Sequence, residues 1–124
     1  NIVNEDILGS MEFACKAAGA KAIVVLGHTK CGAVKGACDD VKLGNLTVLL
    51  DKLKPAINAE KTVTNERNAS NSEFVEKVAS INVKMAMQQV LDKSPILKEM
   101  IAKKEIAMVG GMYDVESGVV EFYD

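Results

Sequence analysis

The segment Ala22–Ala37 holds the residues of this chain that are best suited to metal chemistry. It reads AIVVLGHTKCGAVKGA and places the only histidine, His28, three residues before Cys31. Imidazole nitrogen and thiolate sulfur are both common zinc donors in proteins. The apolar run that ends at Gly27 predicts a buried strand, so both donors come where a strand meets a helix. Ligands gather at this place in open α/β sheets.

Three interpretations of this segment are open from the residues alone. Gly27 and Gly32 have the spacing of the glycines in a phosphate-binding P-loop, which would make the chain a nucleotide-binding protein. Ala33 and Val34, however, stand where that motif needs Lys and Ser or Thr. In a second interpretation, the histidine is a hydrogen-bonded core residue and the cysteine a small apolar one. In the third, the pair is half of a zinc site.

A zinc site needs further protein ligands, and the other cysteines do not supply one. Cys38 follows Cys31 by seven residues, which on a helix is about 10 Å along the axis. Two thiolates that far apart cannot share a metal through bonds of about 2.3 Å. Cys15 falls on the apolar stripe of a predicted helix, and Asp39 and Asp40 suit a solvated turn. The residues therefore give half of a site.

Composition and charge bound the class of protein. Hydrophobic residues make up 48% and charged residues 26% of the 124 residues, a balance typical of one globular domain. A net charge of −2 and an aromatic content of 4% argue against a nucleic-acid partner. No apolar run reaches the roughly 18 residues of a membrane helix, so we expect no membrane partner. Three unevenly spaced cysteines favour a reducing, cytoplasmic location over a disulfide framework.

The first half of the chain shows helix, strand and helix signals in turn. Asn4 is a good N-cap for a helix from about Glu5 to Ala18, which Gly19 stops. The run KAIVVLGH is typical of a central parallel strand covered on both faces. Shorter helical patterns begin near Thr29 and within NLTVLLDKLKPAI, where Pro55 is expected to end the helix.

The second half begins with a polar loop over residues 58–71. A long helix is then predicted from Ser72 to about Asp92, followed by a proline-initiated helix at Ser94–Pro95. EIAMVGGMYDV and VVEFYD predict two strands joined by a turn, so the last strand should be antiparallel. The order indicates an α/β fold with a mostly parallel sheet flanked by helices. So few strands are unusual for such a sheet, and we expect the missing ones to precede Asn1.

At three places the chain resembles the β-class carbonic anhydrases. SMEFACKAAGAKAIVVLGHTKCGAVKGA resembles the family's central block, in which a Ser-Leu-Glu-Tyr-Ala-like helix precedes an apolar strand and Gly-His-x-x-Cys-Gly. GGMYDVESGVVEFY resembles the family's closing hairpin, with Met112 in place of the usual tryptophan. NIV at the start resembles the end of the family's Arg-Asn-x-x-Asn segment. The resemblance covers nearly the whole chain.

This resemblance implies a zinc enzyme that reversibly hydrates carbon dioxide to bicarbonate and a proton. His28 and Cys31 match two of the family's three zinc ligands. Gly32 matches a glycine beside the metal that leaves room for the small substrate, and Phe13 stands where the family often has a tyrosine at the pocket edge. The resemblance also implies a homodimer or a higher homo-oligomer.

One family motif, Cys-x-Asp-x-Arg, is absent from these residues. In the family it supplies the third zinc ligand and an aspartate–arginine pair near the metal. We therefore expect residues 1–124 to be the incomplete C-terminal part of a single β-carbonic anhydrase domain. The catalytic Asp–Arg pair would lie upstream of Asn1, and this segment alone would be nearly inactive. The alternative is a non-catalytic carbonic-anhydrase-like domain used for binding or assembly.

Overall fold

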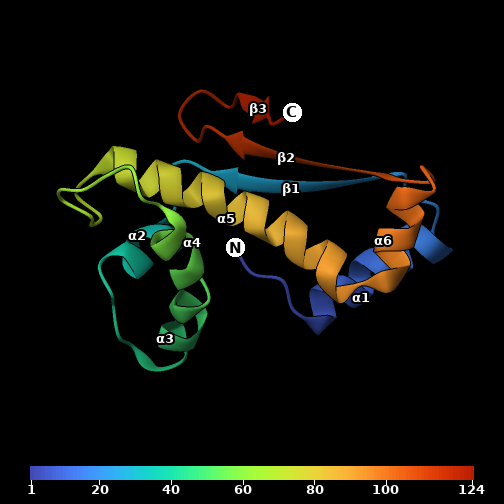
Figure 1. The fold of residues 1–124 in the computed structure, drawn as a ribbon, viewed down its shortest axis with the longest axis horizontal. Helices are drawn as coiled ribbons and strands as arrows, with labels where there is room; N and C mark the ends of the chain where they lie inside the picture. Colours follow the sequence, from blue (N-terminus) through green and yellow to red (C-terminus); the bar gives the residue numbers. More distant parts are fainter.

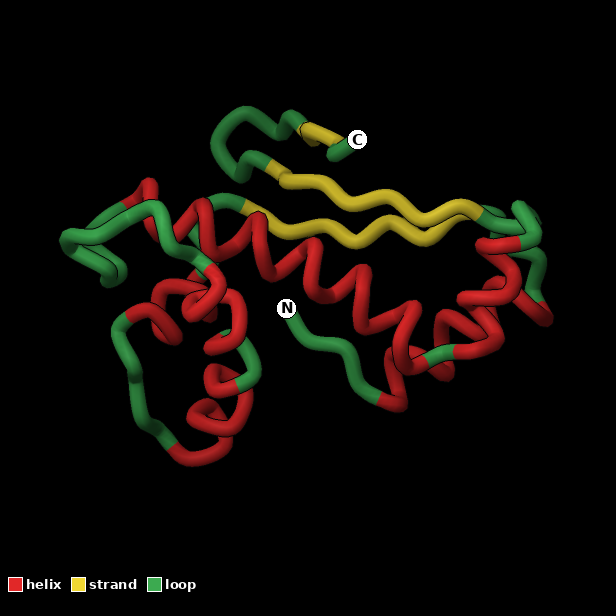
Figure 2. Tube along the Cα trace, viewed as in Figure 1, coloured by secondary structure: helices red, strands yellow, loops and turns green.

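The structure, a computed structural model that describes residues 1–124, combines one small sheet with several helices (Figures 1 and 2). In chain order the elements are α1 (Glu5–Glu12), the π-helical turn η1 (Phe13–Ala17), β1 (Ala22–His28), α2 (Gly32–Cys38), α3 (Gly44–Asp51), α4 (Lys54–Ala59), α5 (Ser72–Lys93), α6 (Pro95–Ala102), β2 (Ala107–Tyr113) and β3 (Val120–Phe122). The predicted N-caps are confirmed, since Asn4 accepts from the backbone of Ile7 and Ser94 from that of Leu97.

The sheet has the strand order β1-β2-β3. β1 and β2 are parallel and in register from Ala22 opposite Ala107 to His28 opposite Tyr113. β3 pairs with β2 in the antiparallel sense, with Phe122 opposite Gly111. The predicted α/β class, with its antiparallel C-terminal strand, is therefore confirmed. β1 lies at one edge of the sheet, so its outer backbone groups have no strand partner in this chain.

The long helix α5 runs beside the two parallel strands along much of the length of the molecule (Figure 1). One core cluster gathers α2, α3, α4 and the start of α5 around Phe74, which is fully buried. A second gathers α1, β1, α6 and the end of α5 around Val90 and Leu97. No helix combines the length and the hydrophobicity that a membrane span requires.

Two glycines allow α5 to approach the sheet closely. A Cβ atom on Gly27 of β1 would lie 2.7 Å from Val83 Cγ2, and one on Gly110 of β2 would lie 2.5 Å from Met87 Sδ. Contacts this short cannot be accommodated without moving the helix or its side chains. The absence of side chains at these two positions therefore sets the distance between α5 and the strands.

The other face of the sheet is not covered by the helices of this chain. Val24 and Leu26 of β1 are 51% and 47% exposed, and Phe122 of β3 is 56% exposed. The prediction that β1 is covered on both faces is wrong for these residues. Because side chains alternate along a strand, α5 covers only the face that carries Ile23 and Gly27.

Two predicted helix boundaries also differ from the structure. Pro55 does not end a helix; it lies in the first turn of α4, where its missing N–H is not needed. The preceding helix, α3, ends at Asp51. α2 begins at Gly32, not near Thr29, because Lys30 has a φ of 55°, which a right-handed helix cannot contain.

A buried carboxylate organises the polar loop that follows α4. Glu60 is only 2% exposed, and it accepts hydrogen bonds from the backbone of Thr62 at 2.9 Å and of Val63 at 3.1 Å. Arg67 is a further partner of Glu60, with its Nη1 3.0 Å from Glu60 Oε2. The guanidinium of Arg67 also stacks over the ring of Phe74 at 4.6 Å, which ties the loop to the start of α5.

Acid should weaken the fold through Glu60. The hydrogen bond from the Thr62 hydroxyl, then those from the loop backbone and Arg67, lower the pKa of Glu60 from 4.5 to about 2. A pKa that is lower in the folded state adds stability above the ordinary value, and this stability is lost as the pH falls towards 2. Denaturant unfolding of the native chain and Glu60→Gln between pH 7 and 2 should therefore show the native advantage shrinking below about pH 4.5. A difference that stays constant over this range would contradict the assignment.

Candidate metal centre

His28 is the last residue of β1, and its ring is oriented by the backbone of the next residue. Nδ1 lies 2.8 Å from the carbonyl oxygen of Thr29. A carbonyl can only accept, so Nδ1 carries the hydrogen and donates it, which leaves Nε2 with a free lone pair. Histidines that bind metals commonly have their second nitrogen held in this way. The sequence did not reveal this partner.

Cys31 precedes α2 directly, at its N-cap position. The residue is 4% exposed and belongs to the same core cluster as Val34 and Phe74. The core therefore fixes the place of its backbone, while Gly32 begins the helix immediately after it.

His28 and Cys31 line one small cavity of about 30 Å³. Asn1 and Asn82 line it as well, the latter from α5. A space of this size holds about one or two water molecules or a single ion. The structure thus brings the two sequence-predicted ligands to one place at the free edge of the sheet.

The donor types of His28 and Cys31 suit zinc, but two donors are fewer than the three protein ligands that a catalytic zinc takes. A neutral imidazole with a free Nε2 and a cysteine sulfur are both zinc donors, and a catalytic zinc takes three protein ligands. No group of three His, Cys, Asp or Glu side chains in these residues could hold a metal ion. These residues therefore contain two candidate donors, and their role as zinc ligands stays a prediction.

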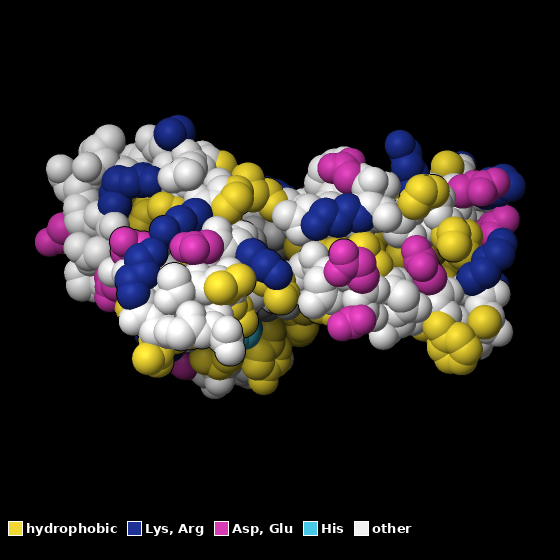
Figure 3. Space-filling view, turned by 90° about the horizontal axis from the view of Figure 1, so that it is seen from below, with side chains coloured by type: hydrophobic (Ala, Val, Ile, Leu, Met, Phe, Trp, Pro, Cys, Tyr) yellow, Lys and Arg dark blue, Asp and Glu magenta, His cyan; other side chains and the backbone are white.

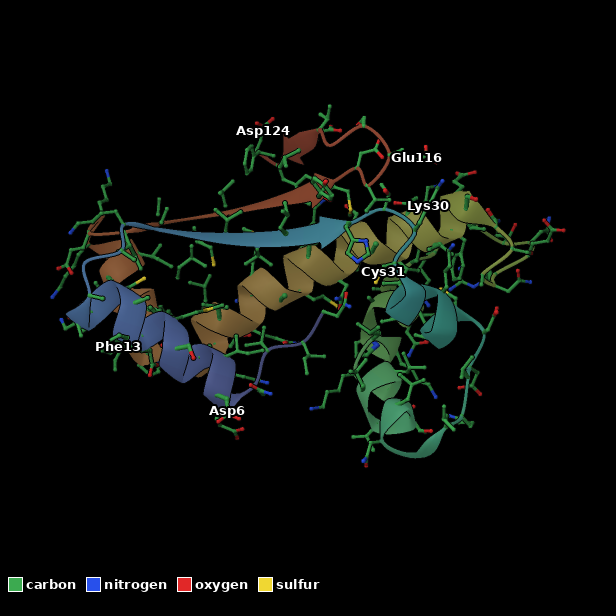
Figure 4. All side chains as sticks on the ribbon, turned by 180° about the vertical axis from the view of Figure 1, so that it is seen from behind. Asp6, Phe13, Lys30, Cys31, Glu116 and Asp124 are labelled. Atoms are coloured by element: carbon green, nitrogen blue, oxygen red, sulfur yellow. The ribbon has the colours of Figure 1, made fainter.

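The loop that carries the two donors, residues 28–31, is held by contacts with the β2–β3 connection and with α5. The hydroxyl oxygen of Thr29 accepts from the backbone of Val115 at 3.1 Å, in the β2–β3 connection. The backbone N–H of Lys30 donates to Glu76 Oε1 of α5 at 3.1 Å. The side chain of Lys30 pairs with Glu116 (Figure 4), and this hydrogen bond raises the pKa of Lys30. These contacts support Lys30 in its left-handed conformation, between the two donors.

Gly32 and Phe13 lie in different parts of the chain. A Cβ atom on Gly32 would meet nothing within 4 Å, so the space beside Cys31 is open, as the predicted substrate pocket requires. Phe13 is 68% exposed on η1, near one end of the molecule and well separated from Cys31 (Figure 4). A single chain does not bring Phe13 to the donors, and the substrate role of both residues stays a prediction.

The remaining cysteines lie outside the small cavity. All three cysteines are free thiols, and Cys15 is buried in the second core cluster. Cys38 lies at the other end of α2 from Cys31, as its spacing predicted. Burial, followed by the charge of Asp39, raises the pKa of the Cys38 thiol to about 11. This thiol is therefore protonated at neutral pH and is a poor metal ligand.

The largest cavity does not contain the candidate metal donors. It measures about 630 Å³ and lies between the N-terminal segment, α5 and Lys52. Asn1 and Asn82 line both cavities, so the two adjoin. The larger one has no histidine or cysteine in its wall, and we place the candidate site in the smaller one.

Sequence reasoning missed Asn82 and Asn1. Asn82 is 8% exposed on the apolar side of α5, and its Nδ2 donates to the backbone oxygen of Asn1 at 3.0 Å. The sequence signal that could have identified Asn82 is a single amide side chain among the apolar residues on one side of a predicted helix. Such a residue must find hydrogen-bond partners when it is buried.

Comparison with known proteins identifies the family. Residues 1–120 match the family model described as carbonic anhydrase. Together with the sheet and the His-x-x-Cys pair at the end of β1, this match shows that the chain belongs to the β-class carbonic anhydrase family.

Individual relatives agree with this assignment. The chain is 30% identical over 122 residues to a carbonic anhydrase of Candida albicans, covering 95% of this chain and 43% of the relative. The crystal structure of the β-carbonic anhydrase CafA of Aspergillus fumigatus matches with a TM-score of 0.79 at 26% identity, covering 99% of this chain and 59% of that one. Crystal structures of two tetrameric β-carbonic anhydrases from Sordaria macrospora match with a TM-score of 0.78 at 26% identity, covering 98% and 61%. The chain therefore spans about half the length of these relatives.

Removing the carboxylate of Glu76 should loosen the loop between His28 and Cys31, which we call the ligand loop. We expect Glu76→Ala to speed hydrogen exchange at the Lys30 amide about 2- to 10-fold, because that amide loses its acceptor. The lost hydrogen bond should cost about 0.5–1.5 kcal/mol of stability. Glu73→Ala, on the exposed side of the same helix, is the matched control and should leave the Lys30 amide unchanged. Equal exchange rates in the two variants, measured by NMR, would rule out a supporting role for Glu76.

Proposed function

We propose that the protein containing these residues is a zinc-dependent carbonic anhydrase, which reversibly hydrates carbon dioxide to bicarbonate and a proton. The observation that carries the proposal is the convergence of His28 and Cys31 on one cavity in a chain of this family. A metal bound there would lower the pKa of bound water from about 15.7 to about 7, which makes hydroxide available at neutral pH.

The residues of this chain would hold the metal and shape the space beside it. His28 would bind through Nε2, because Thr29 holds its other nitrogen. Cys31 would bind as the thiolate, and the open space at Gly32 would admit a small substrate. The third ligand and the aspartate–arginine pair implied by the resemblance would come from residues before Asn1. The free edge of β1 is the place where a preceding strand could pair.

We further propose that the protein self-associates as a homodimer or a higher homo-oligomer in the cytoplasm. The related proteins from Sordaria macrospora are tetrameric. Exposed apolar side chains occur on the open sheet face and on α3, including Leu26, Phe122 and Val48. Surfaces of this kind commonly mark contacts between proteins. On the face that Figure 3 shows, charges of both signs alternate with apolar side chains, without a single-sign patch.

Activity should depend on the residues that precede Asn1. We call a protein that carries the proposed preceding residues the longer chain. Stopped-flow measurement of carbon dioxide hydration should show turnover by the longer chain and a rate at least about 10³-fold lower for residues 1–124 alone, since a zinc ligand and the Asp–Arg pair are lost. Full turnover by the 124 residues would refute the proposed division of the site. A folded, zinc-free and inactive longer chain would favour the non-catalytic alternative.

Zinc content should depend on His28 and Cys31 and should not depend on Cys38. We expect about one zinc per subunit in the longer chain, and less than about a tenth of that in His28→Ala and Cys31→Ser. Cys38→Ser is the matched control, because it removes a thiol from the same helix without touching the cavity, and it should retain its zinc. Elemental analysis of the purified proteins measures this directly. Equal zinc in Cys31→Ser and Cys38→Ser would be incompatible with the proposed ligands.

A further inference from the structure

A buried amide links α5 to the N-terminal segment beside the donor pair. Asn82 is 8% exposed, and its Nδ2 donates to the backbone oxygen of Asn1 at 3.0 Å. The hydrogen bond joins residues far apart in the sequence, and it fixes where Asn1 lies along the helix. Burying an amide among apolar side chains costs free energy unless its polar atoms are paired. An apolar residue at position 82 could not make the hydrogen bond that holds Asn1 in place.

The residue held in this way contacts the sulfur of the proposed ligand. The side-chain Nδ2 of Asn1 lies 3.6 Å from Cys31 Sγ, within reach of an N–H···S hydrogen bond. The amide oxygen of Asn1 is farther away, at 3.9 Å from the same sulfur. Both asparagines line the small cavity with His28 and Cys31.

We infer that Asn1 and Asn82 form a relay that positions the Cys31 sulfur for metal binding. Asn82 holds the backbone of Asn1, and the side-chain amide of Asn1 donates to the sulfur. An N–H donor stabilises a sulfur that carries negative charge, and it restrains the side chain to the rotamer that faces the cavity. Both asparagines are positioning residues, since they act through Cys31. This inference rests on the proposed function, because it presumes that Cys31 binds a metal.

The test uses Co²⁺ as the probe in the longer chain. Binding is followed through the charge-transfer absorption between thiolate and Co²⁺, which reports the sulfur–metal bond itself, and affinity is measured by competition with a chelator. Asn82→Leu and Asn1→Leu remove the amides and keep the number of side-chain heavy atoms. Gln89→Met likewise removes an amide on the same side of α5, seven residues later, in the wall of the larger cavity.

We expect Asn1→Leu and Asn82→Leu each to weaken Co²⁺ binding about 10- to 100-fold, the usual effect of removing a partner of a metal ligand. Gln89→Met should bind Co²⁺ like the native protein. Because Asn82 acts through Asn1, the double variant should bind no more weakly than Asn1→Leu alone. Losses that multiply in the double variant, or native affinity in Asn1→Leu, would overturn the relay.

The same experiment separates this inference from the proposed function. If the native protein binds Co²⁺ with a charge-transfer band that Cys31→Ser abolishes, the metal site stands whatever the asparagine variants do. If Cys31→Ser leaves the band unchanged, the proposed function fails and the relay fails with it. Asn1 is exposed, so its variant keeps the test decisive even where Asn82→Leu unfolds the chain, which thermal melting of the metal-free proteins shows.

Discussion

The packing of α5 against the parallel strands is the constraint on which the rest of the structure depends. Gly27 and Gly110 let the helix approach both strands, and its apolar side chains belong to both core clusters. The same helix supplies Glu76 to the ligand loop and Asn82 to the small cavity. The end of β1 and the start of α2 are therefore fixed by a helix that lies far from them in the sequence.

Hydrogen bonds orient the two candidate donor side chains after apolar packing has placed their backbone. The core places the backbone of Cys31, but the rotamers of two donor side chains need hydrogen bonds to be restricted. The Thr29 carbonyl selects the tautomer of His28, while Asn1 lies against the sulfur. The fold thus places the two candidate donors together at the free edge of a sheet. The proposed division of the site fits a chain that spans about half of the length of its relatives.

Local signals account for what the sequence predicted well. The caps at Asn4 and Ser94, the long helix α5 and the apolar strands depend on short-range chemistry, and all are present. The coverage of β1 was predicted wrongly, because a strand sequence cannot show which other segments pack on it. The contact between Asn82 and Asn1 depends on how α5 is aligned with the N-terminal segment, which is a tertiary property. Pro55 fits either side of a helix boundary, so its position needed the structure.

Zinc K-edge X-ray absorption of the longer chain tests most directly whether Cys31 and His28 bind the metal. If both residues are ligands, sulfur should lie at about 2.3 Å and nitrogen or oxygen at about 2.0–2.1 Å from zinc. In Cys31→Ser, any zinc that remains should have one sulfur fewer, whereas Cys38→Ser should give the native spectrum. A native spectrum from Cys31→Ser, or a folded longer chain that contains no zinc, would show that these residues do not bind the metal.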